Sequence, residues 1–529
     1  MSLSHVVIAP MLVALVTAIV TLLTRSRPTL QGGLSLLGVV GYAVAVAVLV
    51  GDVLSETVLT YQLSNWAAPF GITLVADALS AFMLVLAAVV SLAALAFSVI
   101  YVNSYGQRVS YHPLFHFMLV GVTGSFLTGD IFNLFVWFEV MLMPSYVFVV
   151  FYSGKAHTSA ALKYTVLNLI GSAVMLVAIG GLYSTTGTLN MADMTRRLLA
   201  AEEYGIDPAP VLGLAALLFA VFALKAGIVP FQFWVPEAYS AAPAPITAVL
   251  AGVTKKVGVY AIIRLYFTVF AAATLPEGLG LPGLSGTSFL AFFGPVMFLM
   301  ALGSIFLGGF GAVSRPDLDG VFAYSSIGQV GFIVLPLAVG ATVPAVRSLA
   351  IVAALVYSLN HAIAKSLLFL VSGTVDDAVG AITFDDIGGL TGEMPVLSAG
   401  FFVGSLALIG IPPLTGFFGK LLVFQVASDA TIAGGNGATL ALAAALAGAI
   451  LTIAYLSRAW KEGFWGETTG AVEGATATPG LVAVVVGLAT LLVVVGVGFD
   501  PVYQVANAAA DAALARTDYV RAVGLEVSS

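Results

Sequence analysis

The chain has 529 residues, of which 60% are hydrophobic and 9% are charged, and its net charge is -7. Soluble domains carry about 25% charged residues, so this composition excludes a soluble protein, and the negative charge leaves no basic surface for nucleic acid. The sequence has no cysteine, which excludes disulfides, thiolate metal sites and cysteine-ligated iron–sulfur clusters within this chain.

Apolar runs of about twenty residues recur along the chain, whereas a membrane barrel would show alternating segments of roughly ten. We therefore predict an all-α polytopic membrane protein with about fourteen transmembrane helices. No lysine or arginine precedes the first run, which favours a membrane span over a cleaved signal. The expected spans are residues 4–23, 33–52, 74–102, 113–128, 131–152, 160–183, 209–229, 240–268, 287–311, 321–340, 346–371, 396–427, 438–458 and 479–499.

Two of the expected helices contain a break. The span 209–229 ends at a proline, and the span 396–427 is interrupted at residues 411–413. Each has a lysine near its break, Lys225 in the first and Lys420 in the second. The two helices are five spans apart, so they cross the bilayer in opposite directions. Paired interrupted helices in inverted repeats indicate the ion site of a transporter.

We predict two inverted repeats, formed by helices 4–8 and helices 9–13, and each repeat contains one of these discontinuous helices. The whole chain is expected to form one integrated membrane domain. Its expected parts are the N-terminal helices 1–3 in residues 1–112, a first repeat in 113–268, a second in 287–458, and a last helix with an amphipathic tail in 479–529.

The distribution of basic residues predicts the orientation in the membrane. An even number of spans places both termini on one side. The loops on one side hold Arg25, Arg27, Arg108, Lys155, Arg315, Arg458 and Lys461. The opposite loops and the tail hold Arg196, Arg197, Arg347, Arg516 and Arg521. Cytoplasmic loops carry the excess of lysine and arginine, so both termini are expected outside the cytoplasm.

A few ionisable side chains lie inside the expected spans. A charge at the bilayer centre costs about 2.5–3.5 kcal/mol on insertion scales, so such residues are functional by default. Desolvation disfavours the charged form of a buried lysine, which lets it exchange protons near neutral pH. The alternative is snorkelling to the interface, and Lys255 fits that alternative best. The candidates for a proton relay are Glu139, Lys225, Lys256, Lys365 and Lys420.

Glu139 has no basic residue near it in its own helix. A lone buried carboxylate either stays neutral or pairs with a cation from another helix. We expect Glu139 to pair with Lys225 and to adjust the proton affinity of that lysine. The alternative is a structural ion pair between two helices.

His361 and Lys365 are four residues apart, so they share one helix face, and His361 is expected to support the relay. A single histidine is not a metal site, and no Na+ site is recognisable in the sequence. Ser325, Ser326 and Gln329 lie in another expected span. These three side chains either line a hydrated path beside the lysines or pack helices together.

Several motifs together resemble one family of membrane proteins. They are residues 128–139 (TGDIFNLFVWFE), Lys225 with 229–236 (VPFQFWVP), 243–248 (PAPITA), 254–260 (TKKVGVY), 323–331 (AYSSIGQVG), 361–370 (HAIAKSLLFL) and 416–422 (GFFGKLL). With these motifs the chain resembles the antiporter-like subunits that Mrp-type multisubunit cation/proton antiporters share with respiratory complex I. Within that group it is most similar to the D-type Mrp subunit.

The resemblance implies roles for particular residues. The carboxylate that matches Glu139 pairs with the lysine that matches Lys225, and lysines matching Lys256 and Lys365 continue a hydrated axis at mid-membrane depth. Lys420 matches the last residue of that axis. The sequence leaves open whether Lys255 or Lys256 lines the axis, and the spacing to Tyr260 favours Lys256.

The resemblance further implies a proton-translocating subunit of a Na+/H+ antiporter, which is a secondary transporter component without a cofactor and not an enzyme. Its expected partners are other membrane subunits, protons and Na+, in the plasma membrane of a prokaryote. Two alternatives stay open. One is a proton-pumping subunit of a complex I-like or membrane hydrogenase redox complex, and the other is a non-conducting scaffold subunit.

Overall fold

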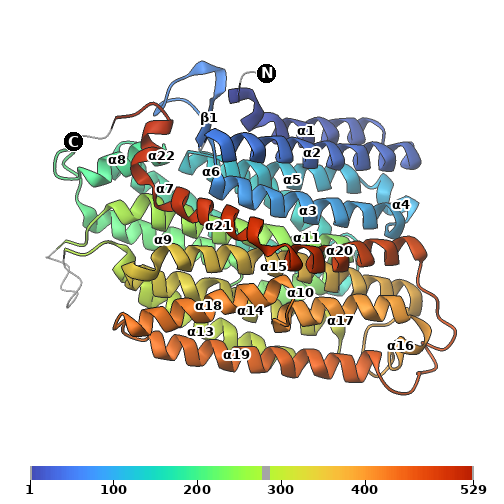
Figure 1. The fold of residues 1–529 in the computed structure, drawn as a ribbon. Coiled ribbons are helices and arrows are strands. Elements are labelled where there is room, and N and C mark those ends of the chain that lie inside the picture. Colours follow the sequence, from blue (N-terminus) through green and yellow to red (C-terminus); the bar gives the residue numbers. More distant parts are fainter. Residues whose placement is uncertain (1–2, 57, 277–285, 527–529) are drawn as a thin grey trace.

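Residues 3–56, 58–276 and 286–526 are described by the structure, which is a computed structural model. The long helices run nearly parallel to one another, with α1 and α2 at one edge of the bundle and α19 at the opposite edge (Figure 1). The N-terminal elements are α1 (Leu3–Leu23), α2 (Pro28–Glu56), β1 (Val58–Gln62), η1 (Leu63–Asn65), β2 (Thr73–Asp77), α3 (Ala78–Tyr101), α4 (Ser104–Arg108) and α5 (Tyr111–Leu127).

The expected first repeat begins with α5 and continues with the elements that follow it. They are α6 (Ile131–Val149), α7 (Lys155–Thr186), α8 (Met191–Leu199), α9 (Pro208–Ala226), α10 (Trp234–Ala241), α11 (Ala244–Val249), η2 (Leu250–Thr254), α12 (Lys255–Ile262), η3 (Ile263–Val269) and η4 (Phe270–Ala272). The elements from α11 to η4 form one continuous helical span, residues 244–272. Two π-helical segments, η2 and η3, flank α12 within this span.

The remaining helices form the other side of the bundle and the C-terminal region. They are α13 (Leu290–Val313), α14 (Leu318–Thr342), η6 (Pro344–Val346), α15 (Arg347–Val379), α16 (Leu390–Glu393), α17 (Pro395–Ile409), α18 (Thr415–Ile432), α19 (Ala438–Ala459), η7 (Trp460–Phe464), α20 (Pro479–Val497), α21 (Phe499–Leu514) and α22 (Arg516–Ala522).

Twelve helices in the described ranges are long and apolar enough to span a membrane. This confirms the predicted polytopic helical class. The count of fourteen stays a prediction, because two of the expected spans are not among these twelve helices. One is α5, with 17 residues, and the other is the pair α17 and α18, whose break divides one expected span into helices of 15 and 18 residues.

Both predicted helix breaks are present, and the first lies earlier than expected. Helix α9 ends at Ala226 rather than at residue 229, because Gly227 adopts a left-handed conformation with φ of 67°. The chain then unwinds until α10 begins at Trp234. Helix α17 ends in the same way at Ile409, because Gly410 has a φ of 93°, and α18 begins at Thr415. A positive φ costs glycine little, so glycine ends each first half-helix.

The predicted span 74–102 begins too early, because residues 74–77 belong to a strand. Strands β1 and β2 form an antiparallel pair in which Val58 lies opposite Asp77. Asp77 then caps α3 by accepting a hydrogen bond from the backbone N–H of Ser80 at 3.0 Å. A short apolar run does not distinguish a strand from a helix by periodicity alone. The fold is therefore helical with one small hairpin.

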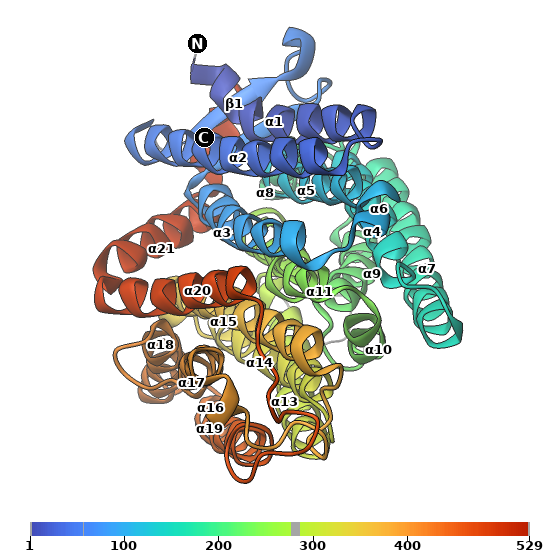
Figure 2. The same ribbon diagram turned by 90° about the vertical axis from the view of Figure 1, so that its right-hand side faces the viewer.

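The C-terminal helices pack against the rest of the bundle. Helices α20 and α21 lie beside α3 and α15 (Figure 2). The face of α21 that meets the bundle is formed by four buried alanines, Ala506, Ala509, Ala510 and Ala513. Thr268 of η3 also donates a hydrogen bond to the carbonyl of Ala513 at 2.7 Å. Small residues let helices approach closely in membrane proteins, so the tail belongs to the folded unit.

A buried ion pair joins the hairpin, the central span and the tail. The guanidinium of Arg264 donates to both carboxylate oxygens of Asp77, at 2.7 and 2.5 Å, and both side chains are 1% exposed. The Arg264 guanidinium also lies 4.9 Å from the ring centre of Tyr519 in α22. Removing one partner of a buried pair leaves an uncompensated charge and costs about 3–5 kcal/mol.

We therefore expect Asp77→Asn to lower the thermal unfolding temperature of the purified protein markedly. Asp207→Asn is the matched control, since Asp207 is exposed and caps α9, and asparagine caps a helix as well as aspartate does. Equal unfolding temperatures for the two variants would contradict a stabilising role for the Asp77–Arg264 pair.

Candidate functional site

Five lysines on α9, α12, α15 and α18 are buried in the interior of the bundle, and we call them the row of lysines. Lys225, Lys255, Lys256, Lys365 and Lys420 are between 0% and 3% exposed. Three of them lie on the span 244–272 or on α15, and the most apolar stretch of each of these helices is completely buried within the protein. Such helices have no face toward lipid, so their ammonium groups cannot reach the membrane interface by snorkelling. The other two lie on the discontinuous helices.

Glu139 and Lys225 lie at one end of this row. The Glu139 carboxylate accepts a hydrogen bond from the hydroxyl of Ser172 in α7. The Lys225 ammonium lies 3.5 Å from the hydroxyl of Tyr164, also in α7, and 5.9 Å from the ring centre of Trp234. No ion pair within 4.0 Å joins Glu139 to Lys225, so the two residues are not in direct contact in this structure.

The centre of the row is a hydrogen-bonded cluster of two lysines, a serine and a histidine. The Lys255 ammonium donates to the hydroxyl of Ser326 at 3.3 Å, and this hydroxyl lies 3.4 Å from Nε2 of His361. The other ring nitrogen of His361, Nδ1, lies 2.5 Å from the ammonium of Lys256. Lys256 also donates to the carbonyl of Ala251 at 2.9 Å. His361 therefore bridges the two neighbouring lysines.

This arrangement corrects the interpretation of Lys255 as a snorkelling residue. Lys255 is completely buried, and its side chain lies close to Gly227, where α9 is broken. Consecutive residues point about 100° apart around a helix, so Lys255 and Lys256 do face different neighbours. Because the span is buried on all sides, both faces are interior. Burial therefore does not distinguish Lys255 from Lys256 as the lysine that lines the axis.

We expect Lys255→Met to reduce cation-dependent proton transport on the order of a hundredfold, the scale of losing one proton-transfer group. Methionine keeps the length of the side chain and removes the ammonium. The measurement is the rate of pH-gradient dissipation in vesicles that contain the complete assembly. Lys461→Met is the control, because Lys461 is exposed. Wild-type rates for the Lys255 variant would exclude this lysine from the relay.

Lys365 begins a second polar chain that runs toward α19. Its ammonium donates to the carbonyl of Phe322 at 3.0 Å and to the hydroxyl of Ser325 at 2.7 Å. Ser325 donates to the hydroxyl of Tyr455 at 2.6 Å. Gln329 donates to the same tyrosine at 2.7 Å. Of the predicted polar residues of α14, Ser325 and Ser326 therefore contact lysines, and Gln329 contacts Tyr455.

Lys420 occupies the other end of the row, at the second helix break. Its ammonium donates to the carbonyl of Ile409 at 3.0 Å, which is the last residue of α17, and lies 5.1 Å from the ring centre of Phe332. Asn360 of α15 contacts the same break, since it accepts a hydrogen bond from Thr415 at 2.7 Å. The carbonyls at the end of a half-helix favour a cation.

The electrostatics of the row are those of buried cations without counter-ions. Among the described residues, no carboxylate lies within 4.0 Å of any of these lysine ammonium groups. Like charges repel strongly where the effective dielectric constant is low, so protonation of one lysine disfavours protonation of the next. Within the described residues no cluster of three or more histidine, aspartate or glutamate side chains could hold a metal ion.

Sequence reasoning missed two tyrosines and a serine that contact the charged residues or the polar chain beside them. Tyr164 contacts Lys225, Tyr455 connects Ser325 to Gln329, and Ser172 binds Glu139. Tyrosine and serine are common in membrane helices as packing residues. Their type alone therefore carries no signal, and only their position beside a charge identifies them.

The fold and the site together define a helical membrane protein with two discontinuous helices and a buried row of lysines between them. The chain belongs to the NADH:quinone oxidoreductase/Mrp antiporter transmembrane family, whose model matches residues 128–446. This confirms the family that the sequence motifs resemble.

Two relatives align with most of the chain. The D-type subunit of the Na(+)/H(+) antiporter of Alkalihalophilus pseudofirmus is 35% identical over 522 residues, which cover 98% of this chain and 99% of the relative. The N-type subunit of the NADH-quinone oxidoreductase of Desulforudis audaxviator is 33% identical over 461 residues, which cover 86% and 84%. Both kinds of assembly named by the family are thus represented among the relatives.

Solved structures share the fold. A chain in the structure of the Mrp complex from Dietzia sp. DQ12-45-1b matches with a TM-score of 0.87 and 27% identity, covering 99% of this chain and 100% of that chain. A chain of respiratory complex I from Thermus thermophilus matches with a TM-score of 0.77 and 22% identity, covering 96% and 99%. The second likeness concerns the fold alone.

Proposed function

We propose that this chain is the proton-translocating subunit of a multisubunit monovalent cation/proton antiporter, with Na+ as the cation. The observation that carries the proposal is the row of buried lysines, each in contact with hydroxyl, imidazole or carbonyl groups, between two broken helices. The name of the Alkalihalophilus relative, a D-type subunit of an Na(+)/H(+) antiporter, supports the cation and the type of assembly. The partners are then the other membrane subunits.

The relay consists of Glu139, Lys225, Lys256, Lys365 and Lys420, with His361 in support and Lys255 added by its position. The negative charge of Glu139 favours positive charge at the Lys225 end of the row. At the other end, the carbonyl of Ile409 accepts a hydrogen bond from the Lys420 ammonium. A proton that reaches one lysine repels the charge on the next. Charge movement at one end of the row is thereby coupled to the other end and to cation movement in a neighbouring subunit.

The cluster around His361 gives the relay its central junction. An imidazole accepts a proton at one nitrogen and releases one from the other, and the two nitrogens of His361 face Ser326 and Lys256. Ser326 in turn contacts Lys255. Protons therefore have a hydrogen-bonded route between the face of the span 244–272 that meets α9 and the face that meets α15.

A second candidate function is proton pumping in a redox complex. The NADH-quinone oxidoreductase relative favours it, as does a chain of an archaeal sulfane sulfur reductase complex that matches with a TM-score of 0.86 and 27% identity. Such an assembly would carry iron–sulfur clusters in other subunits, and their absorbance in the purified complex distinguishes it. A non-conducting scaffold is the third candidate, and it would tolerate loss of the buried lysines.

The test of the function is Na+-induced dissipation of a pH gradient in everted membrane vesicles from cells that lack their own antiporters. Vesicles with the complete assembly are expected to respond to Na+, and vesicles without it are not. A complete assembly that ignores Na+ but carries iron–sulfur clusters would establish the redox candidate. We place the protein in the plasma membrane of a prokaryote with both termini outside the cytoplasm, which labelling of introduced cysteines would test.

A further inference from the structure

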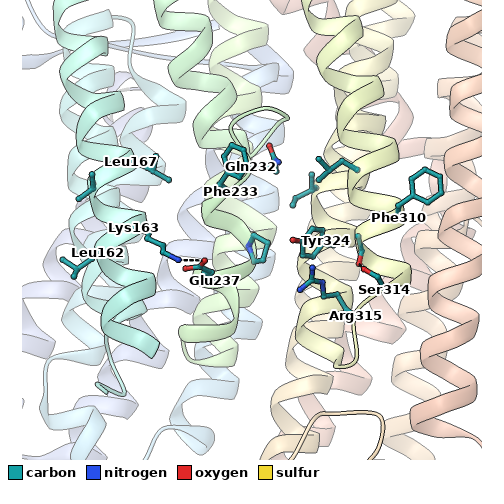
Figure 3. A pocket seen from close by; sticks show the side chains of 15 residues that line it. Leu162, Lys163, Leu167, Gln232, Phe233, Glu237, Phe310, Ser314, Arg315 and Tyr324 are labelled. Atoms are coloured by element: carbon teal, nitrogen blue, oxygen red, sulfur yellow. Dashed lines mark hydrogen bonds and ion pairs between the residues drawn. The ribbon is translucent and has the colours of Figure 1, made fainter. Parts of the chain in front are cut away.

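A cavity of about 1140 Å³ lies apart from the row of lysines, between α7, α10, α13 and α14. It is larger than the roughly 300–1,000 Å³ of ordinary small-molecule sites. Figure 3 shows that its charged residues Lys163, Glu237 and Arg315 lie at one level, and that Leu167 and Phe233 lie above them. The cavity thus has a charged end and an apolar end.

The charged end contains one guanidinium that has no anionic partner. Arg315 stacks on Tyr324 with its central carbon 4.3 Å from the ring centre. Its Nε is buried and has no hydrogen-bond partner, and no carboxylate lies within 4.0 Å of it among the described residues. A buried donor without an acceptor costs free energy, so this end is suited to an anionic group.

The nearby charges are already engaged with other groups. Glu237 pairs with Lys163 at 2.7 Å. Asp317, which lines an adjoining cavity of about 500 Å³ with Arg315, caps α14 by accepting a hydrogen bond from the backbone N–H of Gly320 at 2.7 Å. Arg315 thus has no ion-pair partner within 4.0 Å among the described residues, whereas Lys163 is paired.

The apolar end opens on the outside of the bundle. Phe233 is 68% exposed and Phe310 is 63% exposed, and both line the cavity. Leu307 and Val166 complete the apolar wall and are also exposed in large part. An apolar surface of this kind at membrane depth contacts hydrocarbon, and it offers no ligands to a metal ion, which needs oxygen or nitrogen donors.

We propose that this cavity binds an anionic phospholipid of the surrounding bilayer. Its phosphate lies at Arg315, whose planar guanidinium matches phosphate geometry, and one acyl chain follows Phe310, Leu307 and Phe233. Basic pockets between transmembrane helices on the cytoplasmic side bind anionic headgroups, and Arg315 belongs to the loops expected on that side.

The site adjoins the first helix break, which gives the lipid a consequence for the relay. Gln232 and Phe233 line the cavity and belong to the unwound segment 227–233 that follows α9. The same segment is held from inside by Ser304, which accepts a hydrogen bond from the backbone N–H of Val229 at 3.0 Å. A bound acyl chain packs against the outer side of this segment and restricts its movement next to Lys225.

The test measures lipid binding without measuring transport, so it does not depend on the proposed function. The complete assembly is purified in mild detergent, freed of lipid and titrated with phosphatidylglycerol, and bound lipid is counted by native mass spectrometry. The wild-type assembly is expected to bind one phosphatidylglycerol that Arg315→Gln binds at least about tenfold more weakly, as expected for loss of about 1.4 kcal/mol. Lys461→Gln, which removes an exposed charge elsewhere, is expected to match the wild type.

A second variant separates the apolar end from the charged end. Leu307→Trp fills the acyl-chain part of the cavity and leaves Arg315 in place, so it is also expected to lose the tight site while the assembly remains intact. Equal phosphatidylglycerol binding by wild type and Arg315→Gln overturns the proposal. It is equally overturned if the wild-type assembly binds no phosphatidylglycerol and a cysteine introduced at Phe310 cross-links to a neighbouring subunit, because a protein then covers the cavity.

Discussion

Lys225→Ala is expected to abolish Na+-induced dissipation of the pH gradient in vesicles that contain the complete assembly. Lys225 lies at the end of the helix that breaks at Gly227, and its ammonium lies beside the hydroxyl and ring of Tyr164 and the ring of Trp234. Removing it disconnects Glu139 from the central lysines. The measurement is the initial rate of fluorescence recovery of a pH-sensitive dye after Na+ addition, with a rate equal to that of vesicles lacking the assembly as the expected result.

The control for this experiment is Lys155→Ala. Lys155 begins α7, is exposed and lies outside the row, so this variant is expected to transport at the wild-type rate. Copurification of all subunits shows that each assembly is intact. If the assembled Lys225→Ala variant responds to Na+ as the wild type does, Lys225 is a structural residue and the relay proposal fails.

Lys365→Arg is expected to be as inactive as Lys365→Ala. Arginine keeps a positive charge at the position but holds its proton at every physiological pH. Lys365 contacts the carbonyl of Phe322 and the hydroxyl of Ser325, both of which a guanidinium can also bind. The arginine variant therefore preserves the charge and its hydrogen bonds, and removes only the ability to release a proton.

The comparison of the two Lys365 variants separates a relay from an electrostatic support. The readout is the same Na+-dependent rate, together with the thermal stability of each assembly. If Lys365→Arg retains transport while Lys365→Ala loses it, a fixed positive charge suffices at this position. In that case Lys365 does not bind and release protons, and another group must transfer them between His361 and Tyr455.

The breaks in the two half-helices are predictable because proline and glycine act through the local backbone. Proline removes a backbone donor and clashes with the preceding turn, so residues 411–413 mark the second break without any knowledge of the neighbours. The first break lies three residues before the position that the proline predicts, since the positive φ at Gly227 ends α9 earlier. The strand at residues 73–77 cannot be predicted from its local sequence, because its conformation depends on pairing with β1.

Three properties follow from the amino-acid sequence without any structure: the helical membrane class, the charged side chains inside the spans, and the family. The charged side chains stand out because placing a charge in hydrocarbon costs free energy, so each intramembrane lysine is conspicuous by its type and position. The pairing of Glu139 with Lys225 is harder to predict from the sequence, because the distance between two helices depends on how they pack. In the structure Ser172 donates a hydrogen bond to Glu139, and Tyr164 contacts Lys225.

What surrounds each charge depends on how the helices assemble. Lys255 resembles a snorkelling residue in the sequence, and it becomes part of the row because the span 244–272 is covered on every side. The role of Arg315 likewise depends on the space between α7 and α13, which no local pattern encodes. Helix propensity and hydropathy act along the chain, whereas burial is a property of the assembled helices, and burial determines which ionisable groups lie in the interior.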